Sequence, residues 1–200
     1  MQEFFKVATI EAVLALKSVF GAMAAETVTL DQALGRILAV DVVADDDIPG
    51  FDRSTMDGYA VRAASTYGAS EGTPAYLTVV GTVAMGLVPA LAVGPGQAAR
   101  IATGGMLPQG ADSVVMAEHA EAIDAGTIEV YRSVAPGQHV VARDDDAAKG
   151  QTLLRAGGRL RAQELGLLAA SGATTVTGFG RPRVGIISSG DGVVPVEVIP

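Results

Sequence analysis

Residues 49–61 have the sequence PGFDRSTMDGYAV, a turn-rich segment that leads directly into a β-like run. The pair Asp57-Gly58 suits a tight turn, so the Asp57 carboxylate is expected at the edge of the strand that follows. Asp52, Ser54 and Asp57 could equally satisfy backbone groups of the turn itself. The local pattern therefore leaves a functional and a purely structural interpretation open.

Outward from this segment, short apolar runs alternate with Gly and Pro turns. The pattern predicts a β-rich domain of about 100 residues over 46–147, without repeats. The predicted strands are Tyr59–Arg62, Leu77–Val83, Ala98–Thr103, Ser113–Glu118, Thr127–Tyr131 and His139–Ala142.

Helical spacing of apolar residues occurs on both sides of this domain. The periodicity predicts a helix after Thr9 that stops at Gly21, a second over Leu30–Leu38, and a third over Ala162–Ser171 with Gly172 at its C-terminal end. Residues 151–160 are expected to form a turn with a strand. The combination predicts an α+β, β-rich fold.

A continuous apolar run, Val184–Ile187, lies within a predicted strand over Arg183–Ser188. Such a run is typical of a strand covered on both faces of a parallel sheet, and the polar Gly loop 188–192 follows it. A strand of this kind needs a crossover helix and further strands. The chain is therefore expected to be part of a longer domain.

Composition excludes several classes of function. The chain has 200 residues, 49% of them hydrophobic but only 4% aromatic, which predicts a core of small and branched aliphatic side chains. Its 14 Lys and Arg against 22 Asp and Glu argue against nucleic-acid binding. The absence of Cys excludes disulfides, iron–sulfur clusters and Cys-based zinc sites.

No apolar stretch approaches the roughly 18 residues that a membrane helix needs. Residues 4–25 are the only signal-peptide candidate, but Glu11 and Lys17 interrupt the apolar region. No membrane association is predicted, and the expected location is the cytoplasm.

Paired glycines follow the predicted strand over residues 98–103. Gly104 and Gly105 could turn successive backbone N–H groups toward one point and form an anion-binding nest beside the Thr103 hydroxyl. A simple turn before Pro108 explains the same residues equally well.

Three adjacent carboxylates, Asp144, Asp145 and Asp146, end the third candidate segment, 137–150. They repel one another unless they are solvated, paired with Arg143 and Lys149, or bound to a hard cation such as Mg²⁺. Residues 45–47, also three aspartates, are expected to be a plain surface turn. The isolated His119 and His139 are assigned no role.

Taken together, the order and spacing of these segments resemble the MoeA/gephyrin family of molybdopterin molybdenumtransferases. Residues 49–61 are similar to the family motif P-x-F-D-x-S-x-M-D-G-Y-A-V. Residues 100–115 are similar to I-x-T-G-x-x-x-P-x-G-A-D-x-V-V. Weaker matches extend the resemblance along nearly the whole chain, over 30–43, 137–150, 157–172 and 183–191.

The resemblance implies an elongated homodimer whose subunits each have four subdomains. Residues 27–45 and 148–179 would form subdomain I, and residues 46–147 the β-rich subdomain II. Residues 1–26 would be an N-terminal helix associated with subdomain III. Residues 180–200 would begin that subdomain, an α/β molybdopterin-binding unit of which only the first strand is present.

The activity implied is ligation of molybdate to adenylylated molybdopterin with release of AMP, assisted by Mg²⁺. A molybdopterin adenylyltransferase is implied as a possible partner. Motif matching assigns catalytic roles to Asp57, Thr103 and Asp146, with both acids as metal ligands. The implied substrate-binding residues are Asp52, Ser54, Arg100, Gly104 and Asp191.

Two departures from the family pattern affect these expectations. Asp144 stands where the family has a glycine, which is expected to strain or reshape the loop, and Gly192 stands where the family has a glutamate. A non-catalytic dimerisation or scaffold module is therefore an alternative function. An unrelated β-rich anion-binding domain is a third.

Overall fold

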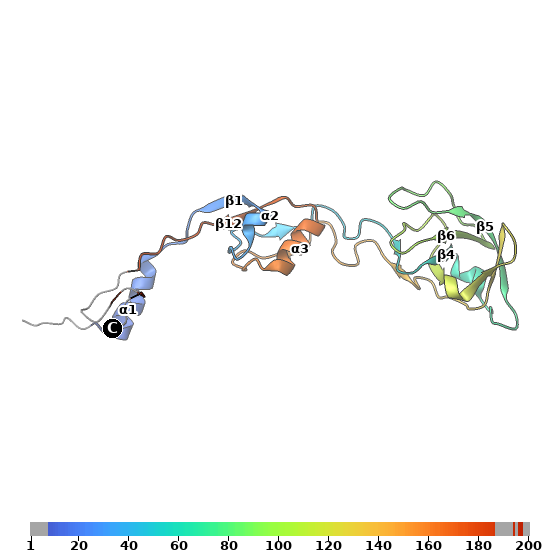
Figure 1. The fold of residues 1–200 in the computed structure, drawn as a ribbon, viewed down its shortest axis with the longest axis horizontal. Helices are drawn as coiled ribbons and strands as arrows, with labels where there is room; N and C mark the ends of the chain where they lie inside the picture. Colours follow the sequence, from blue (N-terminus) through green and yellow to red (C-terminus); the bar gives the residue numbers. More distant parts are fainter. Residues whose placement is uncertain (1–7, 187–193, 195, 198–200) are drawn as a thin grey trace, which may run out of the picture. The chain divides into compact units, whose positions relative to one another are not determined.

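The computed structural model describes residues 8–186, 194 and 196–197. The chain forms two compact units (Figure 1). The first combines the segments Met1–Asp41 and Leu154–Pro200, and the second consists of Val42–Leu153.

The first unit is organised around two strands from opposite ends of the chain. Strand β1 (Ala25–Thr29) pairs antiparallel with β12 (Thr175–Phe179), and the two run side by side in Figure 1. Their sequences, AETVT and TVTGF, carry few apolar residues, and neither strand was predicted. The buried hydrophobic residues of the described part of this unit are Val28, Ala33, Leu38, Leu160, Leu168 and Val176.

The helices of the first unit partly follow the sequence pattern. Helix α1 (Ile10–Ala15) continues as a 3-10 turn, Leu16–Val19, and the Thr9 side chain accepts a hydrogen bond from the Ala12 backbone N–H. Helix α3 (Ala162–Ala170) is also confirmed. None of the described helices has the length and apolar character needed to cross a membrane.

The predicted helix Leu30–Leu38 is too long, because α2 spans only Leu30–Ala33. Leu34 leaves the helical conformation with ψ 126°, and Gly35 follows it with φ +78°. Beyond it, Ile37 and Leu38 form single β-bridges to Arg159 and Gly178. Residues 37–38 therefore pair with distant segments of the chain and do not continue the helix that their apolar spacing predicts.

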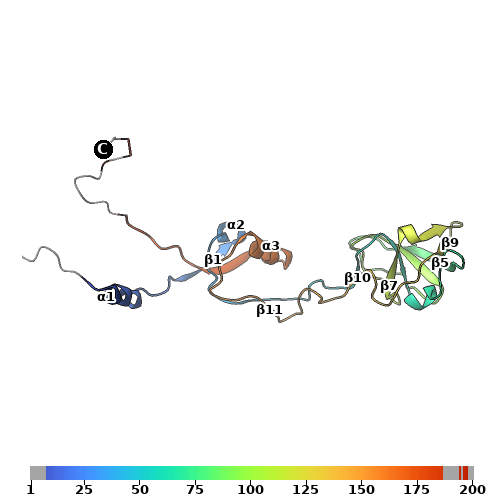
Figure 2. The same cartoon turned by 90° about the horizontal axis from the view of Figure 1, so that it is seen from below.

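The second unit contains a six-stranded sheet with strand order β7-β4-β6-β5-β9-β8. Figure 2 labels β5, β7 and β9 of this sheet. Only β5 and β6 are parallel, and the other neighbours are antiparallel. Five of the six predicted strands form in this sheet to within a few residues, and the sixth, His139–Ala142, forms outside it as a short strand over Val140–Val141. Strand β8 was not predicted. The strand bounds are β4 Gly58–Val61, β5 Ala75–Thr82, β6 Gln97–Ile101, β7 Ser113–Met116, β8 Ala120–Ala122 and β9 Thr127–Val130.

Shorter elements complete the described structure. Strand β3 (Arg53–Ser54) pairs with β10 (Val140–Val141), and β2 (Val42–Val43) pairs with β11 (Thr152–Leu154). Two 3-10 helices also occur, η2 (Ala63–Thr66) and η3 (Ala117–His119).

Strand β4 is buried on both faces of the sheet. Tyr59 and Val61 belong to one hydrophobic cluster, and Ala60 belongs to another on the opposite face with Ile101 and Val114. Tyr59 is the only aromatic residue of either cluster within the described structure, as the composition predicts. This packing holds the start of β4, next to Asp57, in a defined position.

The predicted strand Arg183–Ser188 does not form over its described part. Residues 183–186 have no regular secondary structure and are not paired with any described strand. A parallel strand is stabilised by hydrogen bonds to its neighbours, and these residues lack such a partner in the described structure. Ser188 and the candidate substrate-binding residue Asp191 lie outside the described residues.

Gly58 is required by close packing of the backbone. A Cβ atom at this position would lie 1.9 Å from the Val115 carbonyl oxygen. We expect Gly58→Ala to lower the free energy of unfolding by about 2–3 kcal/mol, because β4 must shift away from β7. Urea denaturation measures this loss. Gly72→Ala is the control, since its Cβ would enter open space, and an equal loss there would contradict the explanation.

Candidate functional site

Asp57 and Thr103 meet at one end of the β4–β6 pair. Gly58 begins β4 and lies opposite Ile101 at the end of β6, so the residues just outside the two strands are neighbours. Asp57 Oδ1 accepts hydrogen bonds from the Thr103 backbone N–H at 2.7 Å and from Thr103 Oγ1 at 3.0 Å. The structure thus brings together two of the three residues predicted to be catalytic.

These bonds hold the pKa of Asp57 below its ordinary value of 3.8. The backbone N–H of Thr103 makes the larger contribution and its hydroxyl the second, because both stabilise the ionised carboxylate. Asp57 is exposed, and its other oxygen, Oδ2, accepts no hydrogen bond from the described part of the chain. Asp57 is therefore ionised at neutral pH and can bind a ligand through Oδ2.

A pocket of about 340 Å³ lies beside this carboxylate. Arg100 lines it, donates from Nη2 to the Tyr59 hydroxyl at 3.2 Å, and lies 5.6 Å from the centre of the Tyr59 ring. The pocket therefore presents one fixed negative and one fixed positive group, a combination that suits an anionic ligand with a bound cation. Its lining residues are Asp57, Gly58, Tyr59, Thr82, Val83, Arg100, Ile101, Ala102 and Ala117.

Of the two explanations for Gly104 and Gly105, the hydrogen bonds favour the turn over the anion-binding nest. The Gly104 N–H donates to the Ser54 carbonyl at 2.8 Å, and the Gly105 N–H donates to the Ala102 carbonyl at 2.9 Å. Gly104 reaches its partner with φ +83°, which a glycine adopts without strain. Both amides are thus used to join the glycine loop to the motif loop.

The side chains of Ser54 and Asp52 both bond to backbone groups, Ser54 within its own turn and Asp52 at a distant segment of the chain. Ser54 is 2% exposed, and its hydroxyl accepts from the Met56 N–H at 3.1 Å and donates to the Met56 carbonyl at 2.5 Å. Asp52 Oδ1 accepts from the Arg143 N–H at 2.8 Å. The structural interpretation is therefore supported for Ser54, whereas the Asp52 carboxylate joins its turn to the third candidate segment, 137–150.

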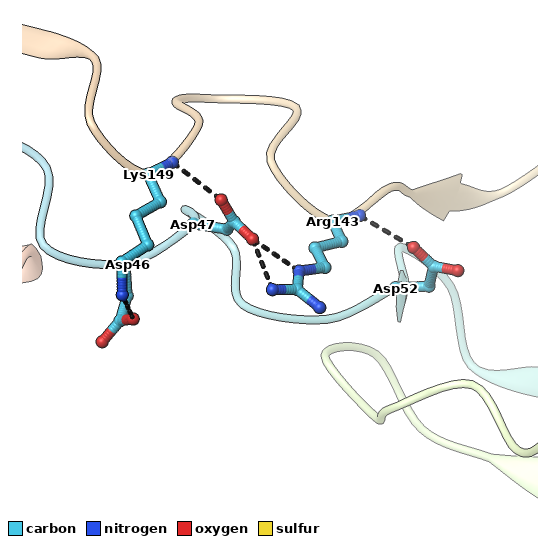
Figure 3. A network of polar contacts seen from close by, with 5 residues as sticks. All are labelled: Asp46, Asp47, Asp52, Arg143 and Lys149. Carbon is cyan, nitrogen blue, oxygen red and sulfur yellow. Dashed lines mark hydrogen bonds and ion pairs between the residues drawn. The ribbon is translucent and has the colours of Figure 1, made fainter.

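Asp47 links its own segment to residues 143–149. The prediction that residues 45–47 form a plain surface turn was wrong for this residue. Its carboxylate accepts from the Lys149 N–H at 2.7 Å and from Arg143 Nε at 2.6 Å (Figure 3). The Lys149 N–H first, and then the Arg143 guanidinium, lower the pKa of Asp47. Lys149 Nζ contacts Asp46 at 3.2 Å. Arg143 and Lys149 thus pair with residues 46–47 rather than with 144–146.

The acidic segment 144–146 is exposed and is attached through its backbone. The Asp146 N–H donates to the Ile48 carbonyl at 2.9 Å, and no hydrogen bond in the described structure joins Asp146 to Asp57 or Thr103. No group of three or more Asp, Glu or His side chains converges on a metal-sized site among the described residues. The predicted strain at Asp144 is confirmed by its φ of +63°.

The sequence analysis missed Tyr59 as part of the site. Tyr59 and Arg100 face each other because they are register partners in β4 and β6. Two further lining residues come from neighbouring elements: Thr82 is the last residue of β5, and Ala117 is the first residue of η3. Only knowledge of the strand pairing would have revealed these residues.

Residues 7–172 match the family described as the MoeA N-terminal region, domains I and II. The chain belongs to this family. The match excludes the unrelated anion-binding domain that the sequence left open. It includes the Asp57 and Thr103 motifs but ends before residues 183–191.

Relatives of this MoeA chain include enzymes named for molybdenum transfer. A molybdopterin molybdenumtransferase from Bacillus subtilis strain 168 is 38% identical over 175 residues, 86% of this chain and 41% of that protein. Molybdopterin molybdenumtransferase 2 of Mycobacterium tuberculosis H37Rv is 40% identical over 166 residues, 82% of this chain and 40% of that protein. The MoeA chain thus spans about two-fifths of the length of these relatives.

Solved structures show the same fold. The molybdopterin biosynthesis moeA protein of Pyrococcus horikoshii OT3 superposes with a TM-score of 0.80 at 39% identity, covering 86% of this chain and 45% of that chain. The α+β, β-rich fold predicted for this MoeA chain is therefore confirmed as that of the MoeA N-terminal domains.

Thr103→Val tests the environment of Asp57. The substitution removes the hydroxyl bond and keeps the backbone bond, so we expect the pKa of Asp57 to rise part of the way toward 3.8. In the wild type, the stability from this carboxylate is present above about pH 4 and is lost as pH falls through the lowered pKa. Carboxyl ¹³C NMR titration measures the shift. Thr82→Val, in the same pocket, should leave it unchanged.

Asp144→Gly tests the strain in the acidic loop. Glycine adopts φ +63° freely, so we expect the free energy of unfolding to increase by about 0.5–1 kcal/mol. Thermal and urea denaturation measure the change. Asp145→Gly removes the same charge at a residue without positive φ, and no increase is expected there. A gain shared by both variants would indicate charge repulsion instead of backbone strain.

Proposed function

We propose that this chain contributes to molybdenum cofactor biosynthesis, in the ligation of molybdate to adenylylated molybdopterin with release of AMP. The names of its relatives support this activity. The observation that carries the proposal is the ionised Asp57, held by Thr103 in a pocket that Arg100 also lines. All three residues belong to the two segments that resemble the family motifs.

The pocket offers one carboxylate, that of Asp57, to the proposed Mg²⁺ ion. Mg²⁺ often takes only one or two carboxylate ligands from the protein and completes its shell with waters and substrate phosphates. Asp57 Oδ2 is available for this role, and Asp146 is proposed as a second ligand from its exposed loop. When bound, the ion would neutralise charge on phosphate and molybdate oxygens.

The chain's own groups would orient the anionic substrate. Arg100 presents a guanidinium fixed by Tyr59, which suits a phosphate or oxyanion oxygen. Thr103 holds Asp57 ionised and fixes its orientation. Asp52, Ser54 and Gly104 would act indirectly, since their polar groups hold the two motif loops together.

The proposal extends to the assembly that the family resemblance implies. Residues 46–147 would act as subdomain II, residues 27–45 and 148–179 as subdomain I, and residues 180–200 as the start of a subdomain III that carries Asp191. Residues 1–26 would associate with that subdomain. We propose a cytoplasmic homodimer that receives its substrate from a molybdopterin adenylyltransferase.

Asp57→Asn in the full-length protein is the direct test. We expect molybdate-dependent AMP release from adenylylated molybdopterin to fall by about 100-fold or more, because the amide cannot supply the negative charge. Glu71→Gln is the matched control, since Glu71 is an exposed acid of the same unit outside the pocket.

Two outcomes would contradict the enzyme proposal. One is unchanged AMP release by the Asp57 variant. The other is no release by the wild type under conditions in which an active relative works, and this would favour the scaffold function suggested by Gly192.

A further inference from the structure

The first unit contains a second pocket, larger than the one at Asp57. Its volume is about 470 Å³, within the range typical of small-molecule sites. Three of its lining residues are arginines from one short segment, Arg155, Arg159 and Arg161. The other lining residues are Leu38, Leu154, Ala156, Gly158, Leu160 and Glu164.

The backbone that carries two of these arginines is fixed by pairing with residues 36–38. The Leu38 N–H donates to the Gly158 carbonyl, and the Leu160 N–H donates to the Arg36 carbonyl, both at 2.8 Å. Leu160 is only 1% exposed. Because side chains alternate along extended backbone, its neighbours Arg159 and Arg161 project together on the opposite side, where both are exposed.

A tight turn brings Arg155 to the same pocket. The Gly158 N–H donates to the Arg155 carbonyl at 3.3 Å, and Gly157 adopts φ +84° within the turn. The Ala156 N–H donates to Asp41 Oδ1 at 2.7 Å, which anchors the turn. The pocket wall is therefore formed by a hydrogen-bonded backbone.

The acid in the pocket balances only one of the arginines. Arg161 Nη2 contacts Glu164 at 2.5 Å, and Glu164 also accepts from the Arg161 N–H at 2.8 Å at the start of α3. The Arg161 guanidinium first, and then its N–H, lower the pKa of Glu164 to about 2. Arg155 and Arg159 make no side-chain hydrogen bond or ion pair within the described structure. The pocket therefore has excess positive charge, in a chain of net charge −8.

We propose that this pocket binds the phosphate group of a small molecule. Two guanidinium groups supply the planar donor pairs that phosphate oxygens accept. The half-buried side chain of Leu154, which also lines the pocket, would contact the rest of the molecule. The proposal does not depend on the function proposed for Asp57.

Calorimetric and NMR titration of the 200-residue chain with inorganic phosphate, and separately with AMP, tests the proposal. We expect saturable binding with shifts in the amide signals of residues 155–164. Arg159→Gln should weaken binding at least tenfold, and the double variant with Arg155→Gln should abolish it. Tighter binding of AMP than of phosphate would identify a phosphate ester as the ligand, and equal affinities would identify free phosphate.

Two control variants locate the binding. Arg132→Gln removes an exposed arginine of the second unit and should change the affinity less than twofold. Arg100→Gln removes the arginine of the Asp57 pocket and should leave the signals of 155–164 responsive. Absence of saturable binding would overturn the proposal. It would also be overturned if Arg100→Gln abolished binding while Arg159→Gln did not.

Discussion

The close approach of Gly58 to the Val115 carbonyl is the constraint on which the candidate site depends. Only a residue without a side chain fits there, since a Cβ atom would lie 1.9 Å from that oxygen. The contact lets β4 lie between β7 and β6 with both faces buried. Asp57 is the residue immediately before β4, so its position beside Thr103 follows directly from this packing.

The polar groups around this site divide into those that hold loops and those that face the pocket. Ser54, Gly104 and Asp52 use their hydrogen bonds to join the motif loop to its neighbours. Asp57 and Arg100 line the pocket instead. Most polar residues of the motif therefore stabilise the loop. Only a few of them can contact a ligand.

The distribution of arginines matters more for ligand binding than the negative net charge. Arg143 is paired with Asp47, and Arg161 is paired with Glu164, so neither contributes a free positive charge. Arg100 lies in one pocket, and Arg155 and Arg159 line another. An acidic protein can thus bind anions where local guanidinium groups outnumber their carboxylate partners.

The sequence by itself determined the β-rich class, the aliphatic core, five of the six strands of the larger sheet and the Asp57 motif, because alternation and turn residues are local signals. It did not reveal that α2 ends at Ala33, that β1 pairs with β12, or that Tyr59 faces Arg100. Those features arise from hydrogen bonds and contacts between residues far apart in the chain. Only the tertiary structure decides them, since register is set by the packing of whole strands.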